Sequence, residues 1–228
     1  SGTSLSSPSD IRNVAKNVTS LAKNNEIVVV CSAIDGVTDD LIRISTMIVQ
    51  RNKNDTTKTL DNVIKKHKQF ANQTIKSSAI KKQLLEKLNI DVLELQELVR
   101  GLTLLKEVST RSLDYLISFG ERLSDDLVSF SLQDLKNKST ALNGKEVGIV
   151  TDSNFGESRP LMDTTRIRIS KILGSLLSKK IIPVVGGFAG ADQHGNITTF
   201  GRGGSDYTAT IIASCINADE IWLMSDVE

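Results

Sequence analysis

The sequence is poor in aromatic residues, in excess charge of one sign and in long apolar runs. Aromatic residues make up 4% of the 228 residues, so the core has to be built from aliphatic side chains. The 28 lysines and arginines are balanced by 27 acidic residues, which excludes the strongly basic surface that holds a nucleic-acid backbone. No apolar run approaches the roughly 20 residues of a membrane span, and no signal peptide is visible. We therefore expect neither nucleic acid nor membrane as a partner.

Cysteine and histidine are equally scarce. Cys31 and Cys215 lie in apolar stretches far apart in the sequence, and neither they nor His67 and His194 have a zinc-binding spacing. We expect no disulfide framework, no metal ligands among these residues, and a reducing compartment such as the cytoplasm.

What the chain does have is an alternation of strand-like and helical segments. Short apolar runs rich in β-branched residues predict buried strands of a parallel sheet at 26–32, 146–150, 181–185 and 220–224. Apolar residues at helical spacing predict helices from Pro8, from about Asp39, and over 111–135, 164–179 and 205–217. This order predicts an α/β fold, a three-layer αβα sandwich around a mainly parallel sheet.

Residues 52–108 differ from this pattern. They are rich in lysine, asparagine and glutamine and keep helical periodicity throughout, as in "LDNVIKKHKQF". We interpret them as an all-helical insertion on one side of the sheet.

Four loops follow predicted strands or precede predicted helices. Such loops form the ligand crevice at the carboxyl edge of an open parallel sheet. They are residues 1–4, 32–38, 184–190 and 201–206.

The loop "GRGGSD" has the strongest individual signal. A helix is predicted to start near Ser205, where free N–H groups attract an anion, and Gly203 and Gly204 let a ligand reach the backbone. Arg202 adds a planar fork for a carboxylate or phosphate. The string is neither a Walker A motif nor a dinucleotide-binding motif. A glycine-rich turn with a solvated arginine and an ordinary N-cap also fits this stretch.

Glu121 lies at the edge of the apolar stripe of the 111–135 helix. A buried carboxylate is costly unless a cation pairs with it, so Glu121 is a candidate partner for a substrate ammonium. A boundary glutamate that reaches solvent is the alternative. Ser32 and Thr38 offer hydroxyl groups in the loop after the first strand, a weaker signal.

In their order along the chain, these stretches resemble the motifs of the aspartate kinases of the amino-acid-kinase superfamily. "SGTSLSSPSDIRNVA" resembles the family's opening K-F-G-G-T-S segment, and "VVVCSAIDGVTDDLI" its V-V-V-S-A-M-x-G-V-T segment. "RSLDYLISFGERLS", "VTDSNFGESRP", "GFAGADQHGNITTFGRGGSDYTA" and "ADEIWLMSDVE" match four further family motifs. The resemblance spans almost the whole chain and is weakest over 52–108.

The resemblance implies a carbamate-kinase-like sandwich that uses ATP and Mg²⁺ to convert L-aspartate to 4-phospho-L-aspartate, the first step of lysine, threonine and methionine biosynthesis. It implies Glu121 as the ammonium partner and Arg202 as the α-carboxylate partner. The other substrate contacts that it implies are Ser32, Thr38, Phe188, Gly203, Gly204 and Ser205. It implies Asp206 and Gly2 as catalytic residues, and Ser1, Gly2, Thr3, Ser225 and Asp226 as nucleotide-binding residues.

The same resemblance implies a catalytic domain over residues 1–228, with its nucleotide-binding part starting at about 181–228, in a homodimer or higher homo-oligomer. The family's lysine would fall two places before Ser1, and its T-D-V-D-G segment reads "SDVE" here. Its regulatory ACT domains lie outside this sequence. We therefore expect little or no kinase activity from the chain as given.

Two other functions are open on the sequence. A sibling enzyme such as a glutamate or acetylglutamate kinase is disfavoured by the "SFGERLS" string. A non-catalytic module for amino-acid binding or dimerisation would lack the upstream lysine, which the natural gene can show.

Overall fold

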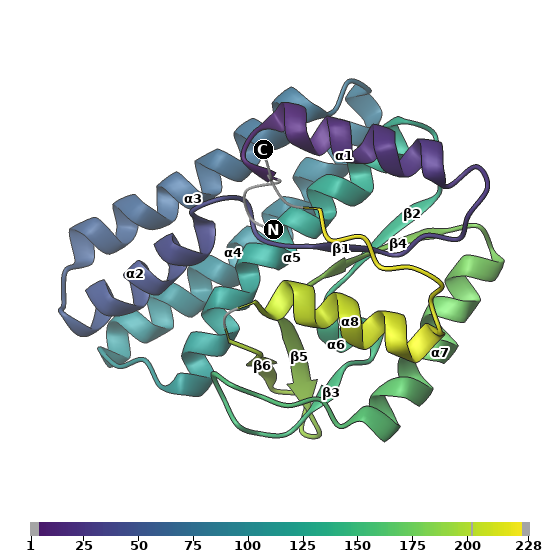
Figure 1. Cartoon of the computed structure of the whole chain (residues 1–228). Coiled ribbons are helices and arrows are strands. Elements are labelled where there is room, and N and C mark those ends of the chain that lie inside the picture. Colours follow the sequence, from purple (N-terminus) through teal and green to yellow (C-terminus); the bar gives the residue numbers. More distant parts are fainter. Residues whose placement is uncertain (1–4, 202, 225–228) are drawn as a thin grey trace.

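The central sheet of the computed structural model is built from short strands between two sets of helices (Figure 1). The structure describes residues 5–201 and 203–224. The helices are α1 Pro8–Leu21, α2 Val37–Val49, α3 Lys53–Thr74, α4 Ser78–Leu105, α5 Thr110–Asp134, α6 Gly144–Val147, α7 Met162–Ser178 and α8 Gly204–Ile216. The strands are β1 Val29–Cys31, β2 Ser139–Leu142, β3 Val150–Thr151, β4 Ile182–Gly186, β5 Ala189–Asp192 and β6 Ile197–Thr199.

The strands form two small sheets that run mainly parallel. The first has the order β1-β4-β2, with both neighbours parallel to β4 and Val29 opposite Val184. In the second, β5 pairs with β3 in parallel and with β6 in an antiparallel hairpin. The parallel pairing places the carboxyl ends of β1 and β4 at one edge, as the sequence predicts.

Strands β1 and β4 of the first sheet are apolar on both sides, and helices cover both of these faces. Cys31 and Val184 pack into a core shared with α1 to α5. Their neighbours Val30 and Val185 point the other way, into a second core with α6, α7 and α8. Burial on both faces explains the unbroken apolar runs. The predicted α/β fold with a mainly parallel sheet between helical layers is confirmed.

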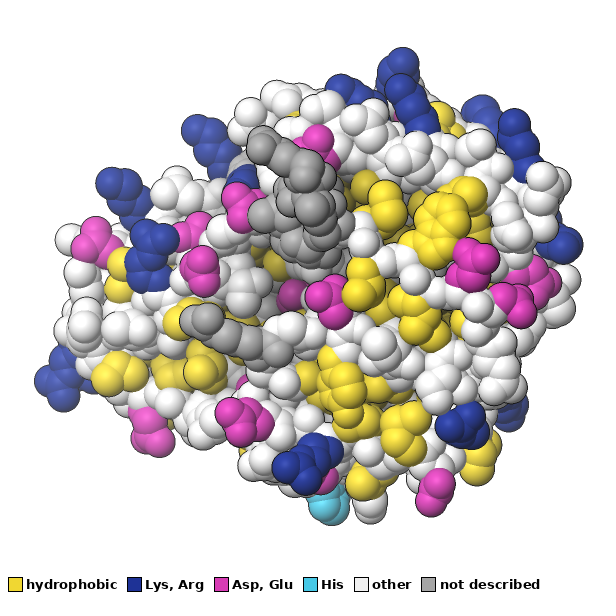
Figure 2. Space-filling model, in the orientation of Figure 1, with side chains coloured by type: hydrophobic (Ala, Val, Ile, Leu, Met, Phe, Trp, Pro, Cys, Tyr) yellow, Lys and Arg dark blue, Asp and Glu magenta, His cyan; other side chains and the backbone are white. Residues whose placement is uncertain are grey.

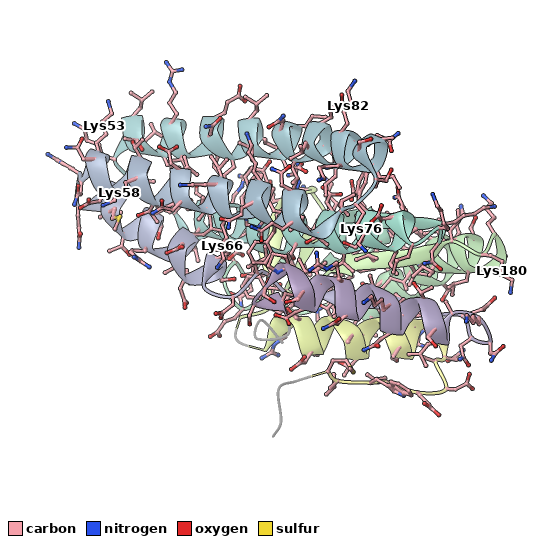
Figure 3. The ribbon with its side chains drawn as sticks, turned by 90° about the horizontal axis from the view of Figure 1, so that it is seen from above. Lys53, Lys58, Lys66, Lys76, Lys82 and Lys180 are labelled. Carbon is pink, nitrogen blue, oxygen red and sulfur yellow. The ribbon has the colours of Figure 1, made fainter. Side chains whose placement is uncertain are left out.

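Residues 53–105 form two long helices, α3 and α4, which lie side by side in one layer (Figure 3). Asn52 and Ser77 cap their N-termini by accepting hydrogen bonds from backbone N–H groups. The labelled Lys53, Lys58 and Lys82 project outward from this layer (Figure 3). The predicted helical character is correct, and the assignment as an insertion within a catalytic domain of residues 1–228 stays a prediction.

Residues 146–150 are not the strand that their apolar character predicts. Asn143 and Glu146 form a reciprocal capping box that starts the short helix α6, and Gly148, at φ +99°, ends it. Strand β3 begins only at Val150. The local hydrogen bonds of the capping box outweigh the strand preference of the neighbouring valine and isoleucine.

The predicted strand at 220–224 is also wrong. Residues 218–224 have no strand pairing, and the side chains of Ile221, Trp222, Leu223 and Met224 are exposed. Figure 2 shows apolar side chains gathered over α8 and the stretch that follows it. An apolar run becomes a strand only where a neighbouring strand supplies backbone partners.

Two smaller corrections concern loops and boundaries. The 184–190 stretch is not one flexible loop, because Ala189 starts the β5–β6 hairpin. Helix α2 begins at Val37, two residues before the predicted start. Within the described ranges, no helix combines the length and apolar character that crossing a membrane requires.

Candidate functional site

The ends of β1 and β4 are tied together at the carboxyl edge of the first sheet. The N–H of Gly187, just after β4, donates to the carbonyl oxygen of Cys31 at 2.9 Å. The loops that leave these strands, 32–36 and 187–188, therefore start side by side. Helix α5 crosses beneath them, and the N-terminus of α8 lies against them.

Glu121 enters this region from α5 with an incompletely bonded carboxylate. Its Oε1 accepts a hydrogen bond from the N–H of Ala33 at 3.3 Å. Among the residues that the structure describes, its buried Oε2 has no hydrogen-bond partner and Glu121 makes no ion pair. Burial raises the pKa of Glu121 to about 8. The alternative of a boundary glutamate that reaches solvent is wrong, since Glu121 is 5% exposed, and the role of Glu121 as an ammonium partner stays a prediction.

Thr38 and Ser32 are held near this carboxylate by close packing on α5. A Cβ on Gly120 would lie 3.0 Å from the Cβ of Ala33 and 3.5 Å from Oγ1 of Thr38, so the small residue lets the loop approach the helix. The hydroxyl of Ser124 donates to the carbonyl oxygen of Ser32 at 2.6 Å. Ser32, in the loop, and Thr38, in the first turn of α2, are both half-buried.

The N-terminus of α8 completes the cluster through two glycine contacts. A Cβ on Gly187 would lie 2.8 Å from Cα and 3.0 Å from Oγ of Ser205, and a Cβ on Gly204 would lie 2.8 Å from the ring of Phe188. Phe188 itself has a left-handed backbone at φ +69°, with its N–H donating to Oγ1 of Thr208 at 3.0 Å. Helix α8 has no side-chain cap at Gly203, which suits an anion at this end.

Six of the predicted substrate residues therefore come together at one edge of the sheet: Ser32, Thr38, Glu121, Phe188, Gly204 and Ser205. Gly203 and Asp206 lie beside them with exposed side-chain positions. The remaining predicted residues lie outside the described residues: Ser1, Gly2, Thr3, Arg202, Ser225 and Asp226.

Asp125 is a residue of this region that sequence reasoning missed. It lies one helical turn after Glu121, is 2% exposed, and its Oδ2 would be 2.8 Å from a Cβ on Gly186. Burial, and then the charge of Asp126, raise the pKa of Asp125 well above its ordinary value. The adjacent acids in "ERLSDDL" on an apolar helix were the available signal.

Asp114 was also missed, and it supports the second sheet. Its carboxylate accepts hydrogen bonds from the N–H and hydroxyl of Thr199 and from the N–H of Gly156. One buried side chain thus joins α5, strand β6 and the 152–160 loop. Burial raises its pKa against these hydrogen bonds.

A cavity of about 830 Å³ opens on the side of α5 that faces α4. Its walls come from α4, α5, α6, the start of β5 and the hairpin turn, and Gly186 and Gly187 also line it. Among the predicted site residues that the structure describes, Glu121 is the one that lines this cavity. In the described part of the chain no group of three or more His, Cys, Asp or Glu side chains is placed to hold a metal ion.

Comparison with known proteins agrees with these features. A sequence profile described as the amino acid kinase family matches residues 1–228. The chain belongs to the amino acid kinase family. Aspartokinase 3, chloroplastic, of Arabidopsis thaliana is 37% identical over 59% of this chain and 24% of its own length. The aspartokinase of Corynebacterium glutamicum is 28% identical over 100% of this chain and 40% of its own length.

Solved structures give the same fold. Aspartokinase III of E. coli in complex with lysine and aspartate has a TM-score of 0.83 at 24% identity, covering 95% of this chain and 46% of that chain. The same enzyme in complex with aspartate and ADP has a TM-score of 0.80. The chain thus spans less than half the length of these amino acid kinase relatives.

Proposed function

We propose that this chain is the catalytic part of an aspartate kinase, which transfers a phosphoryl group from ATP to the side-chain carboxylate of L-aspartate. Membership of the amino acid kinase family and similarity to aspartokinases support a kinase. The observation that carries the choice of substrate is the buried carboxylate of Glu121, which has one backbone donor and an unpartnered oxygen. A ligand ammonium would complete it.

L-aspartate carries one ammonium and two carboxylates, and the proposed site offers partners for each of these groups. In the proposal, Glu121 accepts from the ammonium, and Arg202 receives the α-carboxylate. The hydroxyls of Thr38 and Ser205, the Ser32 loop and the backbone at Gly203 and Gly204 complete the hydrogen bonds, while Phe188 closes the site. Complementary partners at three separated groups would give orientation as well as affinity.

The reacting group needs no general base in this scheme. An aspartate side-chain carboxylate has an ordinary pKa near 4 and is ionised at neutral pH. Catalysis then depends on alignment and on stabilising charge at the transferred group. The uncapped, glycine-lined N-terminus of α8 fits a phosphate or a carboxylate, and the exposed carboxylate of Asp206 stands at the same end. In the proposal Gly2, Ser1, Thr3, Ser225 and Asp226 would hold the nucleotide, and bound Mg²⁺ would supply charge neutralisation.

The proposal extends to the setting of the enzyme. We assign it to the first step of lysine, threonine and methionine biosynthesis, in the cytoplasm, as a homodimer or higher homo-oligomer.

Calorimetry with L-aspartate tests the proposal on this chain. L-aspartate should bind, and L-glutamate and N-acetyl-L-glutamate should bind at least about tenfold more weakly, because a longer or amine-blocked ligand leaves a buried group unpaired. Glu121→Ala and Arg202→Ala should each weaken L-aspartate. Preference for one of the glutamate ligands would support a sibling kinase instead, and unchanged affinity in both variants would overturn the site.

A further inference from the structure

The α4-facing side of α5 carries a network of charged and aromatic side chains beside Glu121. The guanidinium of Arg122 pairs with the fully buried Asp91 of α4 at 2.5 Å and also with Glu94. Lys87 adds a second cation on Asp91 at 2.6 Å. Two helices are thus joined by paired charges around the fully buried Asp91, while Lys87 and Glu94 keep part of their side chains exposed.

Aromatic contacts fix the same guanidinium from below. Arg122 lies 4.9 Å above the ring of Phe119, and the hydroxyl of Tyr115 donates to Glu94. The two rings are themselves in contact at 5.4 Å. One guanidinium nitrogen of Arg122 thus bonds two carboxylates while the ring of Phe119 lies on its face, which restricts the side chain to few arrangements.

Successive residues of a helix point about 100° apart, so the orientation of Arg122 sets the orientation of Glu121. With Arg122 held against α4, Glu121 faces the ends of β1 and β4, where Ala33 donates to it. A rotation of α5 that carried Arg122 away from Asp91 would also move the Glu121 carboxylate away from that N–H.

A second contact joins the α3–α4 pair to the loop that supplies this donor. The ammonium of Lys66, labelled on α3 in Figure 3, donates to the carbonyl oxygen of Asp35 at 2.5 Å. Asp35 and Gly36 form the turn between Ala33 and helix α2, which begins one residue before Thr38. The helical pair therefore contacts both the helix that carries Glu121 and the loop that faces it.

We propose that the α3–α4 pair is the scaffold of the substrate site, and that Arg122 and Lys66 are positioning residues that hold Glu121 and the 32–38 loop in register. The contact of Arg122 with Asp91 and Glu94 is the main support and that of Lys66 the lesser one. The proposal rests on the proposed function, since it assigns Glu121 to a ligand ammonium.

The test compares two ligands that differ only in the amine. L-aspartate and succinate are titrated by calorimetry into wild type and Arg122→Met, with the folded fraction of each protein measured by circular dichroism. Misplacing Glu121 should weaken L-aspartate about tenfold and leave succinate unchanged. Arg122→Lys keeps a positive charge near both acids but loses the planar guanidinium over the Phe119 ring, so its L-aspartate affinity should lie between those of wild type and Arg122→Met.

Gentler variants keep the test valid where Arg122→Met does not fold. Glu94→Gln should weaken L-aspartate in the same ligand-specific way, and Lys66→Met should do so by a smaller factor. Lys82→Met, at an exposed ion pair of the same helix α4, is the matched control and should bind as wild type does.

Equal loss of both ligands, or an unchanged L-aspartate affinity in folded Arg122→Met and Glu94→Gln, would overturn the positioning role while the proposed function stands. Failure of wild type to bind L-aspartate would overturn the proposed function itself.

Discussion

Helix α5 carries two neighbouring ionisable residues, one of them paired within the protein and the other not. On its α4 side, Arg122 has Asp91, Glu94 and the ring of Phe119 as partners. On its sheet side, Glu121 has one backbone donor, a buried oxygen without a partner and a pKa raised to about 8. A buried charge that the protein leaves unpaired is costly, whereas a paired one is stable. The paired side of α5, at Arg122, therefore serves the structure, whereas the unpaired side, at Glu121, is suited to a ligand cation.

Breaking the paired side should have the largest effect. Arg122→Met removes one cation from the buried Asp91 and should lower the free energy of unfolding by about 3 kcal/mol. Urea unfolding measures this. Arg43→Met, at the exposed Arg43–Asp40 pair, is the control and should cost less than about 1 kcal/mol. Equal losses in the two variants would remove the distinction between the paired interior and the surface.

Filling the glycine contacts of the site should have an intermediate effect, on binding. Gly187→Ala places a Cβ 2.8 Å from Cα of Ser205, so the start of α8 has to move. L-aspartate affinity should fall about tenfold by calorimetry. Gly174→Ala, in α7 with nothing within 4 Å of its new Cβ, is the matched control. It should bind normally, and a binding loss there would show that the effect is not local.

The unpaired side should appear as a pH dependence of stability. Because burial raises the pKa of Glu121 from 4.5 to about 8, the folded protein keeps a proton that the unfolded chain has lost. The stabilisation is complete below pH 4.5 and is lost as pH rises through about 8, with a slope of at most about 1.4 kcal/mol per pH unit.

Glu121→Gln isolates this contribution from other buried acids such as Asp125 and Asp126. Unfolding free energies measured between pH 5 and 9 should fall less steeply with pH in the variant than in wild type. Parallel curves would mean that Glu121 is already ionised or already paired in the folded protein.

Much of the fold follows from local signals in the sequence. Ser7 and Pro8 start α1 as predicted, and the run at 181–185 forms β4 because both of its faces are buried. The site residues lie together because parallel strands end at one edge of the sheet. The positions of the loops after the predicted strands were enough to indicate this. The run at 220–224 shows the limit, since pairing depends on a neighbouring strand and not on composition.

The burial of Glu121 and the ion pairs of Arg122 were less predictable from the sequence. Burial of Glu121 depends on how closely Gly120 lets the 32–38 loop approach, a distance that no periodicity encodes. The pairing of Arg122 with Asp91 depends on the crossing of α4 and α5, residues 31 positions apart. Sequence patterns within one helical turn predict helices, strands and their caps. Contacts between distant elements can be seen only in the folded structure.

The number of protons released when L-aspartate binds tests most directly whether Glu121 receives the ligand ammonium. L-aspartate is titrated by calorimetry at pH 7 in two buffers of different ionisation enthalpy, into wild type and Glu121→Gln. Because the carboxyl of Glu121 is largely protonated before binding and ionised against an ammonium afterwards, wild type should release close to one proton per ligand. The variant should release none and bind weakly. Tight binding without proton release, equal in both proteins, would contradict the account.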